Sequence, residues 1–208
     1  MSKTVYVVRH GRTAFNKKQL VQGRRINAPL DDVGIKQSEA LADWFSDKTI
    51  NHIFCSSLIR TRQTAEPIAK LFKLPIQEFA ELDEIDFGDL EGKPTEPKSS
   101  EFYAVREIWK RGEIHHSAPN GESPIDVFKR AGTKGIELIN NTNDDPVLFM
   151  IHGRLARILL SEWLGLGLVN MHKIEHTNAA INILEYDSQA FRPITLNYTG
   201  HLDALTTT

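Results

Sequence analysis

Residues 7–13 read VVRHGRT, an apolar run that ends directly in an arginine and a histidine. The β-branched residues from Val5 to Val8 favour a buried strand. A cation and an imidazole at the end of such a strand lose hydration energy unless a negative group meets them there. The stretch therefore predicts a strand whose carboxyl end holds an anionic ligand, with Arg9 and His10 beside it.

A second apolar run, PVLFMI (146–151), ends in the same way, directly before His152 and Gly153. In open α/β sheets, ligands bind in the crevice at the carboxyl ends of the strands. If the two strands are parallel, both histidines lie at that edge. We therefore expect His10 and His152 in one site.

A third strand candidate, HIFCS (52–56), precedes Arg60. The N-terminus of the helix after this strand would direct backbone N–H groups toward the same edge of the sheet. Arg9 and Arg60 would then join the two histidines, and these groups repel one another unless an anion is bound. A phosphoryl group relieves the repulsion, because guanidinium groups bind its oxygens through paired N–H donors.

The rest of the chain alternates between helical and strand patterns. Further strands are expected over 74–79 and 180–186, and an irregular tail after the second of them. Helices are expected over 33–47, 58–72, 100–111, 122–140 and 154–165. Ser56 or Ser57 is a candidate cap for the helix over 58–72, and Pro67 should kink or split it. The alternation predicts an α/β fold of three layers, α/β/α, with a mostly parallel central sheet flanked by helices.

The 208 residues favour a single domain over 1–208, with a loop and helix embellishment over the active site at about 85–120. The formal net charge of −2 gives no sign of binding to nucleic acid or to an acidic membrane surface. The sequence contains no signal peptide pattern and no apolar run of about 18 residues, so the cytoplasm is expected. A single cysteine, Cys55, excludes an intrachain disulfide and a cysteine-based zinc site.

Several motifs together resemble the histidine phosphatase superfamily, in its phosphoglycerate-mutase-like branch. They occur in the family's order and span nearly the whole chain: RHGRTAFN (9–16), QG (22–23), SSLIRTRQTAE (56–66), LDEIDFGDLEG (82–92), NGES (120–123) and IHGRLAR (151–157). The resemblance implies a nucleophilic His10, with Arg9, Arg60 and His152 holding the phosphoryl oxygens. It also implies that Glu84 is the general acid and then the base, with Glu81, Asp83 and Asp86 as alternatives in the same acidic segment.

The resemblance further implies contacts with the phosphate or substrate from Asn16, Gln22, Gly23 and Gly153. Arg12 and Arg154 depart from the family's usual residues. If both face the pocket, the substrate carries a second anionic group, and otherwise both point to solvent. No metal or organic cofactor is required, since arginine and histidine supply the positive charge.

Other conspicuous residues carry weaker expectations. Arg157 is expected to pack or pair structurally, and His115 and His116 to belong to a surface loop rather than a metal site. His176 and Asn178 lie close to where the family has its pocket wall.

The expected function is a phosphatase that hydrolyses phosphomonoesters of small molecules through a phosphohistidine. The family's mutases carry a longer insertion after the acid residue, where this chain has DFGDLEGKPTEPKSS (86–100). Mutase-type phosphoryl transfer stays an alternative. So does a non-catalytic phosphoryl-binding module, although such a module would be expected to lose His10 or Glu84. Nothing in the sequence fixes the oligomeric state.

Overall fold

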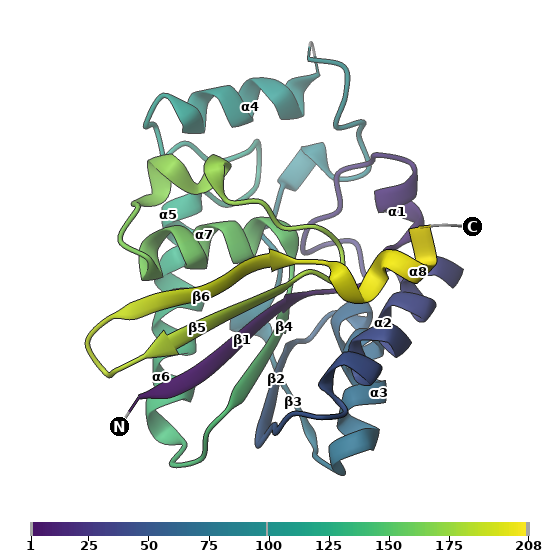
Figure 1. Cartoon of the computed structure of the whole chain (residues 1–208). Coiled ribbons are helices and arrows are strands. Elements are labelled where there is room, and N and C mark those ends of the chain that lie inside the picture. Colours follow the sequence, from purple (N-terminus) through teal and green to yellow (C-terminus); the bar gives the residue numbers. More distant parts are fainter. Residues whose placement is uncertain (1, 99, 207–208) are drawn as a thin grey trace.

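The computed structural model describes residues 2–98 and 100–206. Within these residues, six strands form one sheet in the order β3-β2-β4-β1-β5-β6. The strands are β1 (Lys3–Arg9), β2 (His52–Ser56), β3 (Ile76–Phe79), β4 (Val147–Ile151), β5 (Ile181–Tyr186) and β6 (Phe191–Tyr198). β3, β2, β4 and β1 are parallel to one another (Figure 1). At one edge β5 pairs antiparallel with β1, and β6 pairs antiparallel with β5. The predicted α/β fold with a mostly parallel sheet is confirmed.

Helices cover both faces of this sheet (Figure 1). One face packs against α2 (Asp32–Phe45), α3 (Ile59–Phe72) and α8 (Asp203–Thr206). The other packs against α5 (Pro124–Val127), a π-helical turn (Phe128–Gly132), α6 (Thr133–Asn141) and α7 (Gly153–Trp163). Because side chains alternate along a strand, Val5 and Val7 of β1 enter the core under α7, and Tyr6 and Val8 enter the core under α2.

The register between β1 and β4 brings the two histidine-containing turns together. Arg9 pairs with Ile151, and the backbone N–H of His10 donates to the carbonyl of Ile151 at 2.9 Å. His10 and His152 therefore leave the sheet side by side, as the two matching strand ends predict.

Two details of α3 differ from the sequence-based expectation. Pro67 does not split the helix, because buried Thr64, Ala65 and Ile68 hold it against the sheet on both sides of the proline, and a kink at Pro67 stays a prediction. Neither serine caps α3. The N-cap is Leu58, without a side-chain hydrogen bond, and the hydroxyls of Ser56 and Ser57 donate to Asp83 instead.

The expectation of an irregular tail is also wrong, because residues 191–198 form β6 and pair with β5. The strand was missed although ITLNY (194–198) alternates apolar and polar residues, and its apolar side chains Ile194, Leu196 and Tyr198 are exposed. The helical pattern over 122–140 is realised as α5, the π-helical turn and α6 in direct succession.

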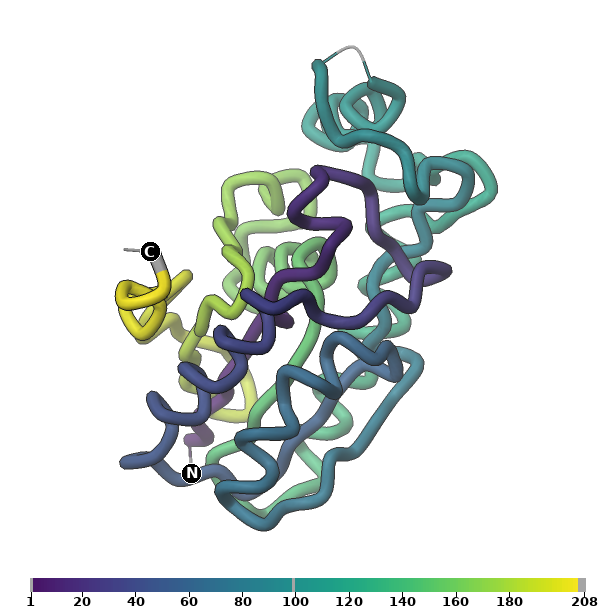
Figure 2. Tube along the Cα trace, turned by 90° about the vertical axis from the view of Figure 1, so that its right-hand side faces the viewer, coloured from purple at the N-terminus to yellow at the C-terminus, as the bar shows by residue number. Residues whose placement is uncertain are grey.

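The embellishment lies beyond the carboxyl ends of the parallel strands (Figures 1 and 2). Its main element is α4 (Glu101–Lys110), which faces the molecule with buried Phe102, Val105 and Trp109. A short helix, α1 (Ala14–Lys17), also projects at this end of the sheet. In the part of the chain described, no helix is long and apolar enough to cross a bilayer.

Candidate active site

His10 lies at the end of β1 with only 3% of its surface exposed. Its Nδ1 lies 2.7 Å from the carbonyl oxygen of Gly11. A carbonyl oxygen can only accept, so Nδ1 carries the proton and the lone pair is on Nε2. Burial, together with the nearby Arg60 and Arg9, holds the pKa of His10 well below its usual value of 6.5. His10 is therefore a neutral imidazole with its free lone pair on Nε2.

His152 has the opposite tautomer. Arg60 Nε donates to its Nδ1 at 3.1 Å, so the proton of the neutral ring is on Nε2. This Nε2 is buried and has no hydrogen-bond partner among the described residues. Burial and the charge of Arg60 hold the pKa of His152 well below its usual value. The two rings lie edge to face with centroids 5.2 Å apart, so His152 presents an N–H donor close to His10.

Arg9 and Arg60 supply positive charge on either side of the histidines. The guanidinium of Arg60 also donates to the carbonyls of Ile26 at 2.8 Å and Gly23 at 3.3 Å. Burial lowers the pKa of both arginines to about 10, against the attraction of Glu84, so both stay charged at neutral pH. Arg9 Nε is buried without a partner among the described residues.

Two glycines of the predicted site act through the backbone. A Cβ at Gly153 would lie 3.0 Å from the Arg9 guanidinium, so this glycine lets Arg9 pack against the start of α7. A Cβ at Gly23 would lie 2.3 Å from a carboxylate oxygen of Glu91. Gly23 does not line the pocket and contributes its carbonyl to Arg60 instead.

Glu84 is 5% exposed and faces the first turn of α7. Its carboxylate accepts backbone N–H groups of Arg154 at 2.9 Å, Leu155 at 2.8 Å and Ile85 at 3.0 Å. These three backbone N–H donors, two of them at the N-terminus of α7, fix the side chain in the pocket wall.

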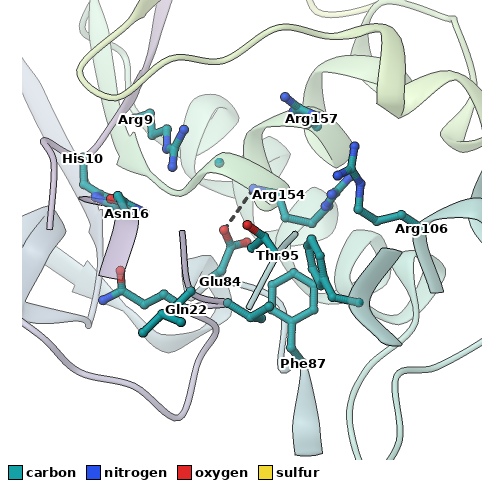
Figure 3. Close-up of a pocket in the computed structure, with 14 residues that line it drawn as sticks. Arg9, His10, Asn16, Gln22, Glu84, Phe87, Thr95, Arg106, Arg154 and Arg157 are labelled. Atoms are coloured by element: carbon teal, nitrogen blue, oxygen red, sulfur yellow. Dashed lines mark hydrogen bonds between the residues drawn. The ribbon is translucent and has the colours of Figure 1, made fainter. Parts of the chain in front are cut away.

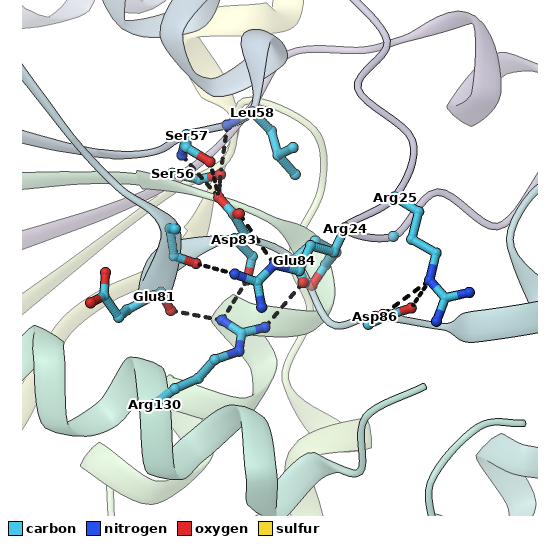
Figure 4. Close-up of polar contacts among 12 residues, drawn as sticks. Arg24, Arg25, Ser56, Ser57, Leu58, Glu81, Asp83, Glu84, Asp86 and Arg130 are labelled. Atoms are coloured by element: carbon cyan, nitrogen blue, oxygen red, sulfur yellow. Dashed lines mark hydrogen bonds and ion pairs between the residues drawn. The ribbon is translucent and has the colours of Figure 1, made fainter. Parts of the chain in front are cut away.

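The alternative carboxylates point elsewhere (Figure 4). Asp83 accepts from the hydroxyls of Ser56 and Ser57, Asp86 pairs with Arg25 at 2.9 Å, and Glu81 is exposed. None of the three lines the pocket.

One arginine holds the whole Glu84 segment (Figure 4). Arg130 donates to the carbonyls of Glu81 at 2.7 Å, Asp83 at 2.9 Å and Glu84 at 3.1 Å, and pairs with Glu122 at 2.7 Å. The sequence analysis did not identify Arg130, because it lies on a helical segment nearly fifty residues along the chain from the carbonyls that it binds.

These groups surround a pocket of about 360 Å³ (Figure 3). Of the predicted site residues, those that line it are Arg9, His10, Asn16, Gln22, Glu84, Gly153 and Arg154. Arg60 and His152 are completely buried next to it. Gln22 accepts a hydrogen bond from the Thr13 hydroxyl at 2.7 Å, and its amide nitrogen is buried without a described partner.

Arg12 and Arg157 correct the sequence-based expectations in opposite directions. Arg12 does not line this pocket, because it pairs with Asp31, the N-cap of α2, at 2.8 Å. Arg157, expected to be structural, lines the pocket together with Arg106 of α4. Arg106 was not among the predicted site residues, although its place on an amphipathic helix of the embellishment was a usable signal.

The residues with weaker expectations lie behind or outside the site. The carbonyl of His176 accepts from Arg9 Nη1 at 2.8 Å, and Asn178 Nδ2 donates to the carbonyl of His10 at 3.1 Å, so both support the wall. His115 and His116 are exposed. No cluster of potential metal ligands occurs within the described ranges.

The fold is an α/β sheet, and two histidines and two arginines meet in a site at the carboxyl edge of its parallel strands. This combination of fold and site defines the class of protein. The sequence model of the histidine phosphatase superfamily (branch 1) matches residues 5–199, and the chain belongs to this superfamily.

Individual relatives carry both kinds of name found in this superfamily. A Yersinia pestis protein named "Probable phosphoglycerate mutase GpmB" is 30% identical over 182 residues, covering 88% of this chain and 84% of that protein. A mycobacterial glucosyl-3-phosphoglycerate phosphatase in complex with VO3 is 26% identical, with a TM-score of 0.85 over 95% of this chain and all of that one. The alpha-ribazole phosphatase of Shigella flexneri, at 23% identity and a TM-score of 0.81 over 94% of this chain and 96% of that one, shares the fold.

Proposed function

We propose that this protein is a phosphatase that hydrolyses small phosphomonoesters through a phosphohistidine on His10. The observation that carries the proposal is a set of three buried nitrogen donors without described partners: Arg9 Nε, Gln22 Nε2 and His152 Nε2. Buried nitrogens without described partners also occur elsewhere, at Trp163 and His201, but these three lie together beside His10, where one ligand could satisfy them. The non-bridging oxygens of a phosphoryl group on His10 would accept from these donors, and Arg9 and Arg60 would offset their charge.

The reaction follows from the tautomers and the position of Glu84. His10 Nε2 attacks phosphorus, the ester P–O bond breaks, and the leaving oxygen takes a proton from the carboxyl of Glu84. Glu84, now a carboxylate, takes a proton from water as the water oxygen attacks phosphorus. The P–N bond then breaks and releases inorganic phosphate and neutral His10.

Phosphoglycerate-mutase-type transfer is the second candidate, because the 30% identical relative carries that name. A mutase passes the phosphoryl group back to a bound acceptor instead of to water. The short segment after Glu84 supports hydrolysis, because it lacks the longer insertion of the mutases that the chain resembles.

The test is phosphate release from a panel of phosphomonoesters in EDTA, compared between wild type and the variants His10→Ala and Glu84→Gln. His115→Ala is the matched control, because this histidine is exposed. We expect His10→Ala to abolish release and Glu84→Gln to reduce it at least roughly a hundredfold. Release that persists in His10→Ala contradicts the proposal, and transfer to a phosphoglycerate without release of phosphate identifies the mutase.

A further inference from the structure

The far wall of the pocket carries three arginines that the phosphoryl chemistry does not use. Arg154 and Arg157 come from α7 and Arg106 from α4, and all three line the same pocket as His10. In the view of Figure 3, Arg9 and His10 lie on one side of Glu84, and these three arginines lie on the other.

These arginines differ from the rest of the molecule in having no acidic partner. Apart from Arg60, which bonds to His152 and to carbonyls, each arginine outside the pocket pairs with a carboxylate. Arg106, Arg154 and Arg157 form no ion pair with any described carboxylate. The guanidinium of Arg154 instead lies over the ring of Trp109, 5.5 Å from its centroid.

Three half-buried cations that form no ion pair oppose one another, and the charges of Glu84 and, for Arg157, Glu175 offset only part of this repulsion. Burial, followed by the charges of Arg157 and Arg106, lowers the pKa of Arg154 to about 9. Burial and Arg106 lower the pKa of Arg157 as well. An anion bound among these groups would remove the repulsion and satisfy their N–H donors.

The position of Glu84 indicates which part of the substrate reaches these arginines. The leaving oxygen must approach Glu84, so the leaving group extends from His10 past Glu84 toward Arg106, Arg154 and Arg157. A cavity of about 360 Å³ is at the small end of ligand pockets, which span roughly 300–1,000 Å³. A compact leaving group fits a pocket of this size.

We propose that Arg106, Arg154 and Arg157 form a second anion subsite, so that the substrate is a compact phosphomonoester whose leaving group carries a carboxylate or a second phosphoryl group. This inference rests on the proposed phosphatase function. It makes α4 a specificity element, because α4 supplies both Arg106 and Trp109, the ring under Arg154.

Matched pairs of esters test the subsite. 3-Phosphoglycerate differs from glycerol 3-phosphate by a carboxylate, and fructose 1,6-bisphosphate differs from fructose 6-phosphate by a phosphoryl group. We expect wild type to favour the member with the second anion by at least about tenfold in kcat/KM for one pair, and the preferred pair identifies the anion. Each of Arg106→Gln and Arg157→Gln should reduce that ratio about tenfold.

Arg111→Gln is the matched control, because Arg111 follows α4 directly and pairs with Glu113 at 3.5 Å. It should keep the wild-type ratio. Wild-type ratios near one for both pairs, or unchanged ratios in Arg106→Gln and Arg157→Gln, overturn the subsite.

Calorimetric titration of His10→Ala with the same esters separates the two proposals. Tighter binding of the ester with the second anion supports the subsite even if wild type hydrolyses nothing, in which case the phosphatase proposal alone fails. Hydrolysis by wild type without any preference in rate or binding overturns the subsite alone.

Discussion

At the scale of single residues, the chemistry depends on where two protons lie. Gly11 fixes the His10 proton on Nδ1, and Arg60 fixes the His152 proton on Nε2. The sequence predicts both histidines and Arg60 in one site, because each follows a recognisable strand. It could not predict the tautomers, which depend on the atom that each ring nitrogen contacts. Nor could it predict the ion pair with Asp31 that keeps Arg12 out of the pocket.

The low pKa of His10 gives a prediction at this scale. Since burial disfavours the charged ring, His10 should stay neutral as the pH falls through 6.5 and take up a proton only well below it. Nitrogen-detected NMR of the imidazole rings, assigned with His10→Ala, measures this directly. A midpoint near 6.5 in the ligand-free protein would contradict the buried, neutral nucleophile.

At the scale of elements, the site depends on the irregular segment that carries Glu84. A helical turn holds this segment in place. Glu84 follows a short 3-10 helix (Ala80–Leu82), and Arg130 of the π-helical turn binds three carbonyls along this stretch. The acidic segment itself was evident in the sequence. Arg130 was not, because its partners are backbone groups, which leave no trace in residue types.

We expect Arg130→Lys and Arg130→Gln both to misplace Glu84, because neither side chain can reproduce a planar fork of donors to three carbonyls and Glu122. Leaving groups that need a proton should suffer most. The expected result is a loss of about tenfold or more in kcat/KM for alkyl phosphates and a clearly smaller loss for p-nitrophenyl phosphate, whose leaving group needs little acid catalysis.

The exposed neighbour Lys129 supplies the control, as Lys129→Gln should behave as wild type. Equal losses for both kinds of ester in Arg130→Gln would point to a general structural defect instead of a positioning role for Arg130.

At the scale of the whole molecule, burial of histidines links stability to pH. His10, His152 and His176 are all buried, and burial holds the pKa of each well below 6.5. In the unfolded chain they regain ordinary values, so below pH 6.5 the unfolded state binds more protons. The contribution of these histidines is complete above pH 6.5 and is lost as the pH falls below it.

Each such histidine should lower the free energy of unfolding by about 1.4 kcal/mol per pH unit once the pH is well below 6.5. Urea unfolding at pH 7.5, 6.5 and 5.5 measures the slope. His176→Gln should reduce the slope by about one proton, whereas His115→Ala should leave the contribution of the three buried histidines intact. A free energy of unfolding that does not change with pH over this range would be inconsistent with three neutral buried rings.

The whole fold was more predictable than its extensions. The central strands are buried on both faces, so their sequences are continuous apolar runs, Val5–Val8 and Val147–Ile151, which are easily recognised. β6 follows β5 directly as a hairpin, and ITLNY (194–198) alternates apolar and polar residues, so the sequence did contain a local signal for this strand. The position of Arg106 in the pocket depends instead on contacts between segments far apart in the sequence, such as that of Arg154 with Trp109.

The central place of β1 also has a consequence for how the protein is made. β1 precedes both of its neighbours in the chain, because β4 and β5 come from residues 147–186. The pocket around His10 therefore cannot form until β4 and β5 have been translated. A nascent chain stalled before residue 147 holds β1 with both edges unpaired, which makes this strand a candidate for protection during synthesis.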